Sequence, residues 1–422
     1  MQRCQTARPQ GADGSTAEAW DAGTGPAVAD AARSAAARAA EADITGRLAP
    51  ETVSLLTRAG FARHFVPRVW RGLEGTFGEL LARVAAVGEG CASAAWLAAL
   101  WATHGRYAAQ LPPRGQRELW GDSPDVRIAA ALRPAGLARR ERNGWRLTGS
   151  WDCVSGVADA DWLLLAAREA EHPVPPGLPG EAPRLLAVPA DAVLVRDSWR
   201  CTGMRGTGSH TAQLMQPLLV PEHRTCPMTD VLAGAPGPGL ARCHTTPAYL
   251  GTGLLLCAAA LGAARRALEE WTHWAARVHA KARAARQDDR ALHGSLTRTS
   301  DDIDAAALLL RDAAARADSG TRAERDVLRN RRQSAAAADL LVSAVERLYR
   351  TAGMHACGTP GLLERTWRDV HALAAHQALC RETASLLYAN AVLAPMEPAP
   401  RTPCDGAAHR PQPLAEAVAG AR

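Results

Sequence analysis

The hydrophobic pattern of this 422-residue chain changes its period twice. Residues 31 to about 120 follow a helical spacing of Ala, Arg and Leu, whereas residues 124–228 hold short apolar runs separated by Gly, Pro and Asp. Long helical patterns return after Pro238. The order predicts an α+β protein, mostly α. We expect a disordered leader, a helical domain, a β domain, a helical bundle and a flexible tail over residues 1–28, 29–122, 123–232, 238–396 and 397–422.

Individual elements can be placed within this order. The apolar runs of the middle region predict strands over 127–132, 145–148, 162–167, 185–188, 192–195 and 213–220. The C-terminal region predicts four long helices, over 250–277, 301–318, 324–351 and 362–393. Gly353 would end the third helix as a C-cap, and Pro395 would stop the fourth.

The stretch from Trp145 to Gly156 carries the most local information. Trp145, Leu147 and Gly149 alternate with polar residues, which predicts a half-buried strand that ends at Ser155. A hydroxyl and exposed backbone at the edge of a sheet can meet the polar rim of a flat cofactor. An ordinary hairpin with a serine in its turn explains the same letters, so this segment alone leaves both interpretations open.

Bulk composition narrows the class of protein. The net charge of +6 is modest for this length and does not by itself indicate nucleic acid. The ten cysteines include no CxxC pair and no Cys/His group at zinc spacing, so we expect reduced thiols and no metal site. No secretory h-region and no apolar run of membrane-spanning length stands out, which predicts a soluble, cytoplasmic protein without a membrane partner.

Three further segments could carry chemistry. His104 lies late on an apolar helix with Trp96 and Trp101, where it is either a core residue or a group facing a planar ligand. The glycine-rich turn over 203–210 lacks both the dinucleotide spacing and the phosphate-loop ending, and can be a plain strand connection. His371 and His376 are five residues apart, about 140° around a helix, so they cannot both face one site.

The basic run over 325–332 has two interpretations. It could contact nucleic acid or phosphate, but Glu324 and Asp326 dilute its charge, which favours a solvated helix face.

Four segments in order resemble the flavin-dependent monooxygenases built on the acyl-CoA dehydrogenase fold, the oxygenase components of two-component systems. They are Gly90–Trp96 with His104, the 147–156 stretch with Asp161-Trp162, the turn over 203–209 with Val220–Arg224, and Ala352-Gly353 with Arg368–His371. The resemblance covers about residues 42–394. It implies an N-terminal helical domain, a central β-barrel-like domain, a C-terminal four-helix bundle and a homotetramer.

The resemblance also implies a flavin between the β domain and the bundle. Ser155 would hydrogen-bond the flavin near N5, and Cys153 stands where relatives often have an aromatic residue against the ring. Further flavin contacts are implied at Arg205, Gly206, Thr207 and Gly353. Met354-His355 departs from the small residues usual after Ala-Gly.

On the substrate side, the resemblance implies that His104 faces a small aromatic or polyketide-like molecule, with Trp96 and Trp101 beside it. His376 matches the histidine that replaces the dehydrogenase base, with His371 as the fallback. A partner reductase would supply reduced FMN or FAD, which reacts with O2 to give a C4a-hydroperoxide. Ser155 would retain the peroxide, His376 would donate a hydrogen bond to it, and His104 would activate the substrate.

Two other functions compete with this one. An acyl-CoA dehydrogenase or oxidase needs a carboxylate base where this chain has His376-Gln377, although another helix could supply one. The basic run over 325–332 suggests the second alternative, a non-catalytic protein that uses the same fold to bind nucleic acid or a partner.

Overall fold

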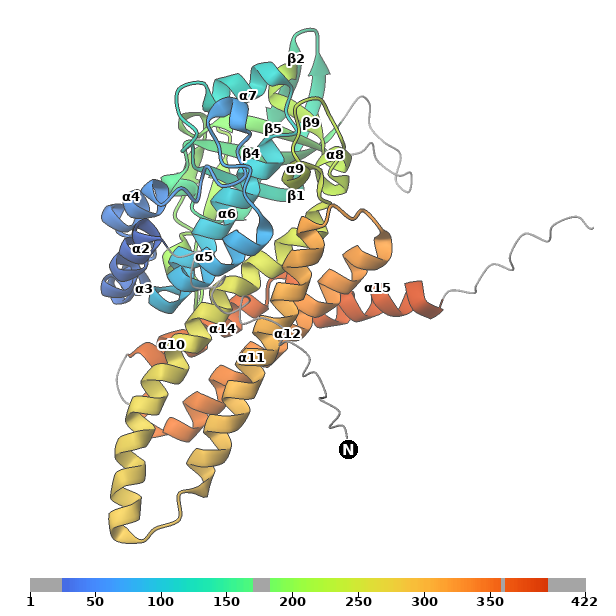
Figure 1. Ribbon diagram of the computed structural model, residues 1–422. Coiled ribbons are helices and arrows are strands. Elements are labelled where there is room, and N and C mark those ends of the chain that lie inside the picture. The colour runs from blue at the N-terminus through green and yellow to red at the C-terminus, as the bar shows by residue number, and fades with distance from the viewer. Residues whose placement is uncertain (1–24, 170–182, 358–360, 394–422) are drawn as a thin grey trace, which may run out of the picture.

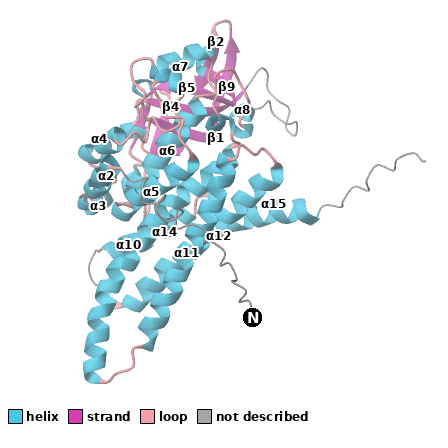
Figure 2. Cartoon of the chain, in the orientation of Figure 1, coloured by secondary structure: helices cyan, strands magenta, loops and turns pink. Residues whose placement is uncertain are grey.

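The computed structural model describes residues 25–169, 183–357 and 361–393. The strands gather at one end of the molecule, the N-terminal helices lie beside them, and long C-terminal helices extend away from both (Figure 1). Figure 2 shows how small the strand region is beside the helices. The predicted α+β class with mostly helical structure is confirmed.

The N-terminal helices surround one fully buried helix. They are α2 (Pro26–Ala37), α3 (Ala39–Thr45), α4 (Pro50–Arg58), α5 (Phe77–Gly90), α6 (Ala92–Ala108) and α7 (Pro113–Trp120). Every residue of α6 except Leu100 is buried, as expected for a helix that is apolar on all sides. Because α6 contacts α5, α10 and β1, its side chains reach the junction between the helical layers and the sheet.

The strands form two sheets. They are β1 (Ile128–Glu141), β2 (Gly144–Thr148), β3 (Ser150–Val154), β4 (Trp162–Glu169), β5 (Arg184–Pro189), β6 (Leu194–Arg196), β7 (His210–Gln213), β8 (Leu218–Pro221) and β9 (Thr225–Pro227). A six-stranded sheet has the order β8-β2-β1-β4-β5-β9, and a three-stranded sheet has the order β3-β7-β6. Strands β1 and β4 are parallel, with Ile128 opposite Trp162, and the other pairs are antiparallel.

Two predicted strands are wrong because each is divided. The strand expected from Trp145 to Ser155 is β2 and β3, which belong to different sheets. The chain crosses between the sheets at Gly149, where a Cβ atom would stand 2.7 Å from the Cα of Gly136 and 3.0 Å from the Trp151 ring. The strand expected over 213–220 is likewise divided into β7 and β8, on either side of Pro217.

The C-terminal region contains α8 (Met228–Ala233), α9 (Arg242–Thr245), α10 (Ala248–Ala285), α11 (Arg290–Asp318), α12 (Glu324–Ala352), α13 (Met354–Cys357), α14 (Leu362–Ala374) and α15 (Arg381–Leu393). Gly353 ends α12 with φ 53°, as predicted. The single helix expected over 362–393 is wrong, because α14 stops at Ala374. A one-turn 3-10 helix, Gln377–Leu379, follows, and its N-cap is His376.

Two smaller expectations need correction. Helix α2 begins at Pro26, so the leader predicted over 1–28 reached too far; the rest of that leader, like the tail from residue 397, lies outside the described residues. Helix α10 is long and apolar enough to cross a membrane by length and composition, contrary to the expectation that no run would be. Within its most apolar window 83% is buried inside the protein, which is the pattern of a core helix.

Candidate active site

Ser155 is the first residue after β3 and lies in a chain of hydroxyl groups. Its Oγ accepts a hydrogen bond from the Trp96 indole at 3.2 Å and lies 2.8 Å from Ser209 Oγ. Ser209 Oγ lies 2.7 Å from Thr207 Oγ1, and Thr207 donates to the Met204 carbonyl. Three segments distant in the sequence therefore meet at Ser155: α6, the end of β3 and the glycine-rich turn.

Proton counting gives this chain a direction. The Thr207 hydroxyl spends its only proton on the Met204 carbonyl, so it must accept from Ser209. Ser209 then has no proton left for Ser155, and Ser155 must donate to Ser209. The Ser155 oxygen accepts from Trp96 and retains one lone pair. In this arrangement Ser155 offers a ligand an acceptor, not a donor.

His376 lies next to the same group. Its ring makes an edge contact with Trp96, with centroids 5.4 Å apart. Its Nδ1 accepts from the backbone N–H of Ala378 at 3.2 Å, so the proton of the neutral ring is on Nε2. Part of the residue is accessible to solvent, but burial of the imidazole lowers its pKa. The break between α14 and α15 thus presents a neutral histidine with a free N–H donor.

His371 lies elsewhere. Its Nδ1 contacts the Trp367 carbonyl at 2.7 Å, its ring packs on the Trp367 indole, and its Nε2 is 3.7 Å from Glu346 of α12. The structure therefore brings His376, and not His371, against Trp96, whose indole donates to Ser155.

His104 is held in one tautomer from α6. Its Nδ1 is 2.8 Å from the Ile128 carbonyl, which can only accept, so Nδ1 carries the proton and Nε2 has a free lone pair. Burial lowers the pKa of His104 to about 4. His104 is therefore neutral near pH 7 and suited to accept a proton or hydrogen bond at Nε2.

Trp101, also on α6, is 1% exposed, and its indole N–H has no hydrogen-bond partner among the described residues. The nitrogen lies close to Gly156, where a Cβ atom would be 3.6 Å from it. Gly156 has φ 66° and its N–H donates to the Thr207 carbonyl. A buried N–H donor without a partner, beside a glycine with positive φ, marks a place where the acceptor atom of a ligand can bind.

The glycine-rich turn is anchored to α14. A Cβ atom on Gly203 would stand 2.1 Å from the Arg368 carbonyl, so only glycine permits this approach. Asp369 accepts from the Met204 N–H at 2.6 Å, and Arg368 donates to the Thr202 carbonyl at 2.6 Å. The predicted site residues Arg205, Gly206 and Thr207 follow directly as a short 3-10 helix.

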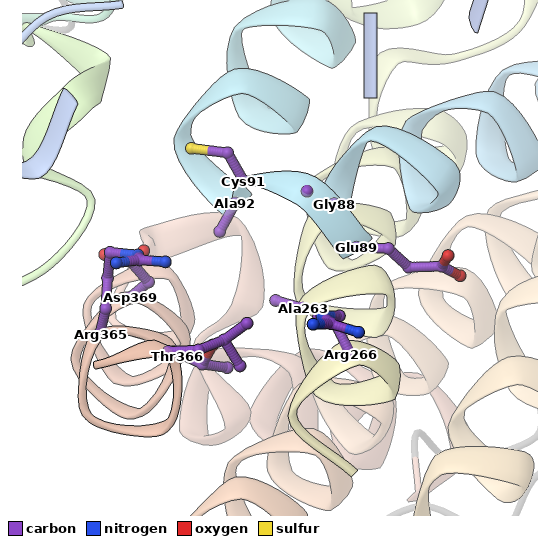
Figure 3. A pocket seen from close by; sticks show the side chains of 11 residues that line it. Gly88, Glu89, Cys91, Ala92, Ala263, Arg266, Arg365, Thr366 and Asp369 are labelled. Atoms are coloured by element: carbon purple, nitrogen blue, oxygen red, sulfur yellow. The ribbon is translucent and has the colours of Figure 1, made fainter. Parts of the chain in front are cut away.

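Asp369 lines a small cavity behind this turn, at the junction of α5, α6, α10 and α14 (Figure 3). The cavity measures about 20 Å³, which is room for about one water molecule and not for a flavin. Burial raises the pKa of Asp369 to about 6, and burial together with Asp369 raises the pKa of Cys91 to about 11. Asp369 is thus an anchor of the turn and Cys91 stays a thiol.

A larger cavity of about 540 Å³ opens on the other side of the turn. Its lining includes the backbone of Gly156, the Arg205–Gly208 segment and the loop that joins α3 to α4. This volume is in the range of small-molecule and cofactor sites. Arg205 reaches across its edge, where Nε donates to the Asp43 carbonyl at 2.6 Å.

Two predicted cofactor residues are not part of the Ser155 group. Gly353 lies at the far end of α12, where the neighbouring His355 stacks on Trp274 of α10 at 5.5 Å. Cys153 is exposed, with φ 58°, and burial of part of its surface raises the pKa of its thiol.

The basic run over 325–332 is occupied by contacts within the protein. Arg331 lies over the Tyr249 ring at 4.4 Å, Arg332 lies over the Tyr388 ring at 4.5 Å, and Arg329 pairs with Asp312 at 3.1 Å. Arg325 and Arg329 are exposed, so the run fits the predicted solvated helix face better than a nucleic-acid surface.

Sequence reasoning did not identify Ser209 and Asp369 as site residues. The alternation of Thr207 and Ser209 within a glycine-rich turn was the available signal for the first. Asp369 was identified only as part of a motif. Nothing in the sequence indicates that its carboxylate accepts from the Met204 N–H, which is distant in the chain.

Comparisons with known proteins show the family to which the chain is similar. The family model described as acyl-CoA dehydrogenase, C-terminal domain, matches residues 254–381. The FADH(2)-dependent resorcinol hydroxylase, oxygenase component, of Rhizobium sp. (strain MTP-10005) is 30% identical, over 83% of this chain and 88% of that protein. The flavin-dependent monooxygenase, oxygenase subunit HsaA, of Rhodococcus jostii (strain RHA1) is 28% identical, over 83% and 93%. XiaF from Streptomyces sp., solved with FADH2 and glycerol, has a TM-score of 0.80 at 27% identity, over 91% of this chain and 98% of that one.

Proposed function

Because the chain belongs to the flavin-dependent monooxygenases with an acyl-CoA dehydrogenase-like fold, as an oxygenase component, we propose that it hydroxylates a small aromatic molecule with O2. The observation that carries this proposal is the oriented hydroxyl chain from Trp96 through Ser155 to Ser209, with His376 against Trp96. Relatives named for resorcinol and for p-hydroxyphenylacetate make a phenol the preferred substrate class.

The residues present fit a reduced flavin. Ser155 has a free lone pair that suits an N–H donor such as N5–H of the reduced ring, and Trp101 has a buried N–H without a partner. The adjoining cavity of about 540 Å³ supplies room beside Gly156. When bound, the reduced flavin would supply the oxygen chemistry, by reacting with O2 to a C4a-hydroperoxide that transfers its distal oxygen.

The protein's own groups would orient the reactants and handle protons. Ser155 would hold the flavin N5–H and thereby slow the loss of peroxide. His376 would donate a hydrogen bond from Nε2 to the peroxide, and His104 would accept the phenol proton at Nε2. The apolar walls, including Trp96 and Trp101, would exclude water from this space.

Assembly and partners follow from the same proposal. A separate reductase would deliver FMNH2 or FADH2, as the name "oxygenase component" implies for a relative. A homotetramer would cover apolar side chains that are exposed on α15, among them Leu386, Val392 and Leu393. The eight cysteines of the described residues are all free thiols, which is compatible with the cytoplasm.

The proposal is tested by supplying chemically reduced FMN or FAD, O2 labelled with oxygen-18 and a panel of phenols that includes resorcinol. We expect a hydroxylated product that carries one labelled oxygen atom, with at least one flavin. Reoxidation of the flavin with hydrogen peroxide as the only product of O2, and with every phenol recovered unchanged, would contradict the proposal.

The acyl-CoA dehydrogenase function is separated by one further measurement. That reaction needs a carboxylate base, whereas the break between α14 and α15 presents His376 to Trp96. We expect no bleaching of bound oxidised FAD by a medium-chain acyl-CoA thioester under anaerobic conditions. Rapid bleaching would favour the dehydrogenase.

A further inference from the structure

A histidine, an aspartate and a second histidine meet at the tip of the α10–α11 hairpin. We propose that His279, Asp289 and His293 bind one divalent transition-metal ion of the zinc type. The site lies where α10 ends and α11 begins, at the end of the hairpin far from the strands and from α6 (Figure 1). It is separate from the proposed oxygenase function and does not depend on it.

The three side chains offer one ligand atom each at one point. These atoms, one from each residue, all lie within 4.8 Å of one another. His279 Nδ1 is hydrogen-bonded to Asp289 Oδ2, and His293 Nε2 is 3.7 Å from the same oxygen. The two imidazole rings are 5.3 Å apart at 57°. Small rotations of the side chains would place one metal ion between all three atoms.

The donor set selects the metal. Two imidazole nitrogens and one carboxylate oxygen are ligands typical of Zn²⁺, which binds them at about 2.0–2.2 Å in a tetrahedral arrangement. Three protein ligands leave the fourth position for water. Mg²⁺ requires a near-octahedral set of oxygens and is a poor match for a site with two imidazoles.

The surroundings support a built site. The Asp289 side chain is 15% exposed, because it lies between the two histidines at the start of α11. The neighbouring carboxylate, Asp288, is bonded to Arg290. Arg286 has φ 53° at the end of α10, so the chain turns sharply and brings the two helices together.

Sequence spacing could not reveal this group. Asp289 and His293 stand ten and fourteen positions after His279, across the turn that joins α10 to α11, and this spacing matches no zinc motif. The expectation that the chain has no metal site was based on such motifs alone. A metal ion here would add a cross-link at the tip of two long helices that already pack against each other.

The test uses the full chain, purified without a histidine tag and treated with EDTA. Isothermal titration with Zn²⁺ should show one site per chain that is absent with Mg²⁺. The affinity should fall at least about tenfold in Asp289→Asn and in His293→Gln. His273→Gln, which changes an exposed histidine of α10 outside the cluster, should bind Zn²⁺ as the parent chain does.

A second readout separates binding from folding. Zn²⁺ should raise the melting temperature of the parent chain and of His273→Gln, but not of Asp289→Asn, and all metal-free chains should melt alike. The proposal is overturned if the parent chain does not take up Zn²⁺ at micromolar concentration. It is also overturned if Asp289→Asn and His293→Gln bind Zn²⁺ as tightly as the parent chain.

Discussion

At the scale of single residues, the position of one proton decides what each site residue can do. Ser155 presents an acceptor to a ligand because its own proton goes to Ser209, the Ser209 proton goes to Thr207, and the Thr207 proton goes to the Met204 carbonyl. His104 and His376 are both neutral, but backbone contacts leave the first with a free lone pair and the second with a free N–H. The two histidines are therefore not interchangeable.

Replacing Ser155 by alanine should affect the reduced flavin before it affects folding. The variant loses the lone pair proposed to hold N5–H and leaves the Trp96 N–H without an acceptor, at a cost of about 1–3 kcal/mol in stability. We expect the flavin C4a-hydroperoxide to decay faster, as measured by stopped-flow absorbance after O2 is added. Ser300→Ala, which removes a hydroxyl bonded to the Leu296 carbonyl within α11, is the matched control. An unchanged lifetime in Ser155→Ala would refute the N5 role.

A pair of histidine variants tests which ring reaches the chemistry. In His376→Asn the donor beside Trp96 is displaced, so hydroxylation of the substrate should slow by about 10²-fold. His371→Asn changes a ring that contacts Trp367 and Glu346, and its rate should stay near that of the parent chain. Equal losses in both variants, measured as product formed per reduced flavin consumed, would contradict the assignment.

At the scale of elements, the site depends on a turn that is held by a helix. Asp369 of α14 binds the Met204 N–H, and this bond fixes the segment that carries Thr207 and Ser209. Asp369 is thus a positioning residue, since it acts on Ser155 through the turn. Its raised pKa of about 6 still leaves it ionised near pH 7.5.

Asp369→Ala should loosen this turn. The Met204 N–H would be buried without an acceptor, which costs about 1–3 kcal/mol of unfolding free energy, and the affinity for reduced flavin should fall. Asp369→Asn keeps an acceptor oxygen and should recover most of that affinity. Asp30→Ala, in an exposed pair with Arg33 on α2, controls for loss of a carboxylate. Full flavin affinity in Asp369→Ala would rule out the positioning role.

Helices and strands could be predicted from the sequence where the hydrophobic period alone determines them. The prediction failed where a tertiary contact interrupts the hydrophobic period. The apolar spacing predicted the existence of α10, α11 and α12, but α10 extends to Ala285 beyond the expected end at 277, and α11 begins at Arg290 before the expected start at 301. The crossing at Gly149 depends on Gly136 and Trp151. Helix α14 ends at Ala374, where a 3-10 helix capped by His376 follows, and no proline or glycine marks this break in the sequence. The resemblance proposed Ser155, Trp96 and His376, which lie close together in the structure, but the protonation states of these residues follow only from their contacts.

At the scale of the whole molecule, buried histidines couple stability to pH. Burial, with a contribution from Arg83, lowers the pKa of His64 to about 4, whereas an unfolded chain would hold it near 6.5. Between these values the unfolded state binds more protons. The stability contributed by neutral His64 is therefore present above pH 6.5 and is lost as the pH falls towards 4, by up to about 3 kcal/mol.

His64→Gln should reduce this acid sensitivity. The amide can donate to the Thr76 carbonyl and accept from Arg83, as the ring does, but it takes up no proton. In urea unfolding at pH 7 and pH 4.5, we expect the variant to lose about 2–3 kcal/mol less than the parent chain. The exposed His273→Gln should behave as the parent chain does. An identical acid loss in His64→Gln would contradict the pKa argument.

The central claim is that this protein controls the reaction of reduced flavin with O2, and one measurement addresses it without knowledge of the substrate. The protein is mixed anaerobically with reduced FMN or reduced FAD, O2 is then added, and the absorbance is followed by stopped flow. We predict a C4a-hydroperoxide transient with at least one flavin, whose lifetime is shorter in Ser155→Ala. Direct return to oxidised flavin with both cofactors, at the rate seen in free solution and with no transient, would contradict the account.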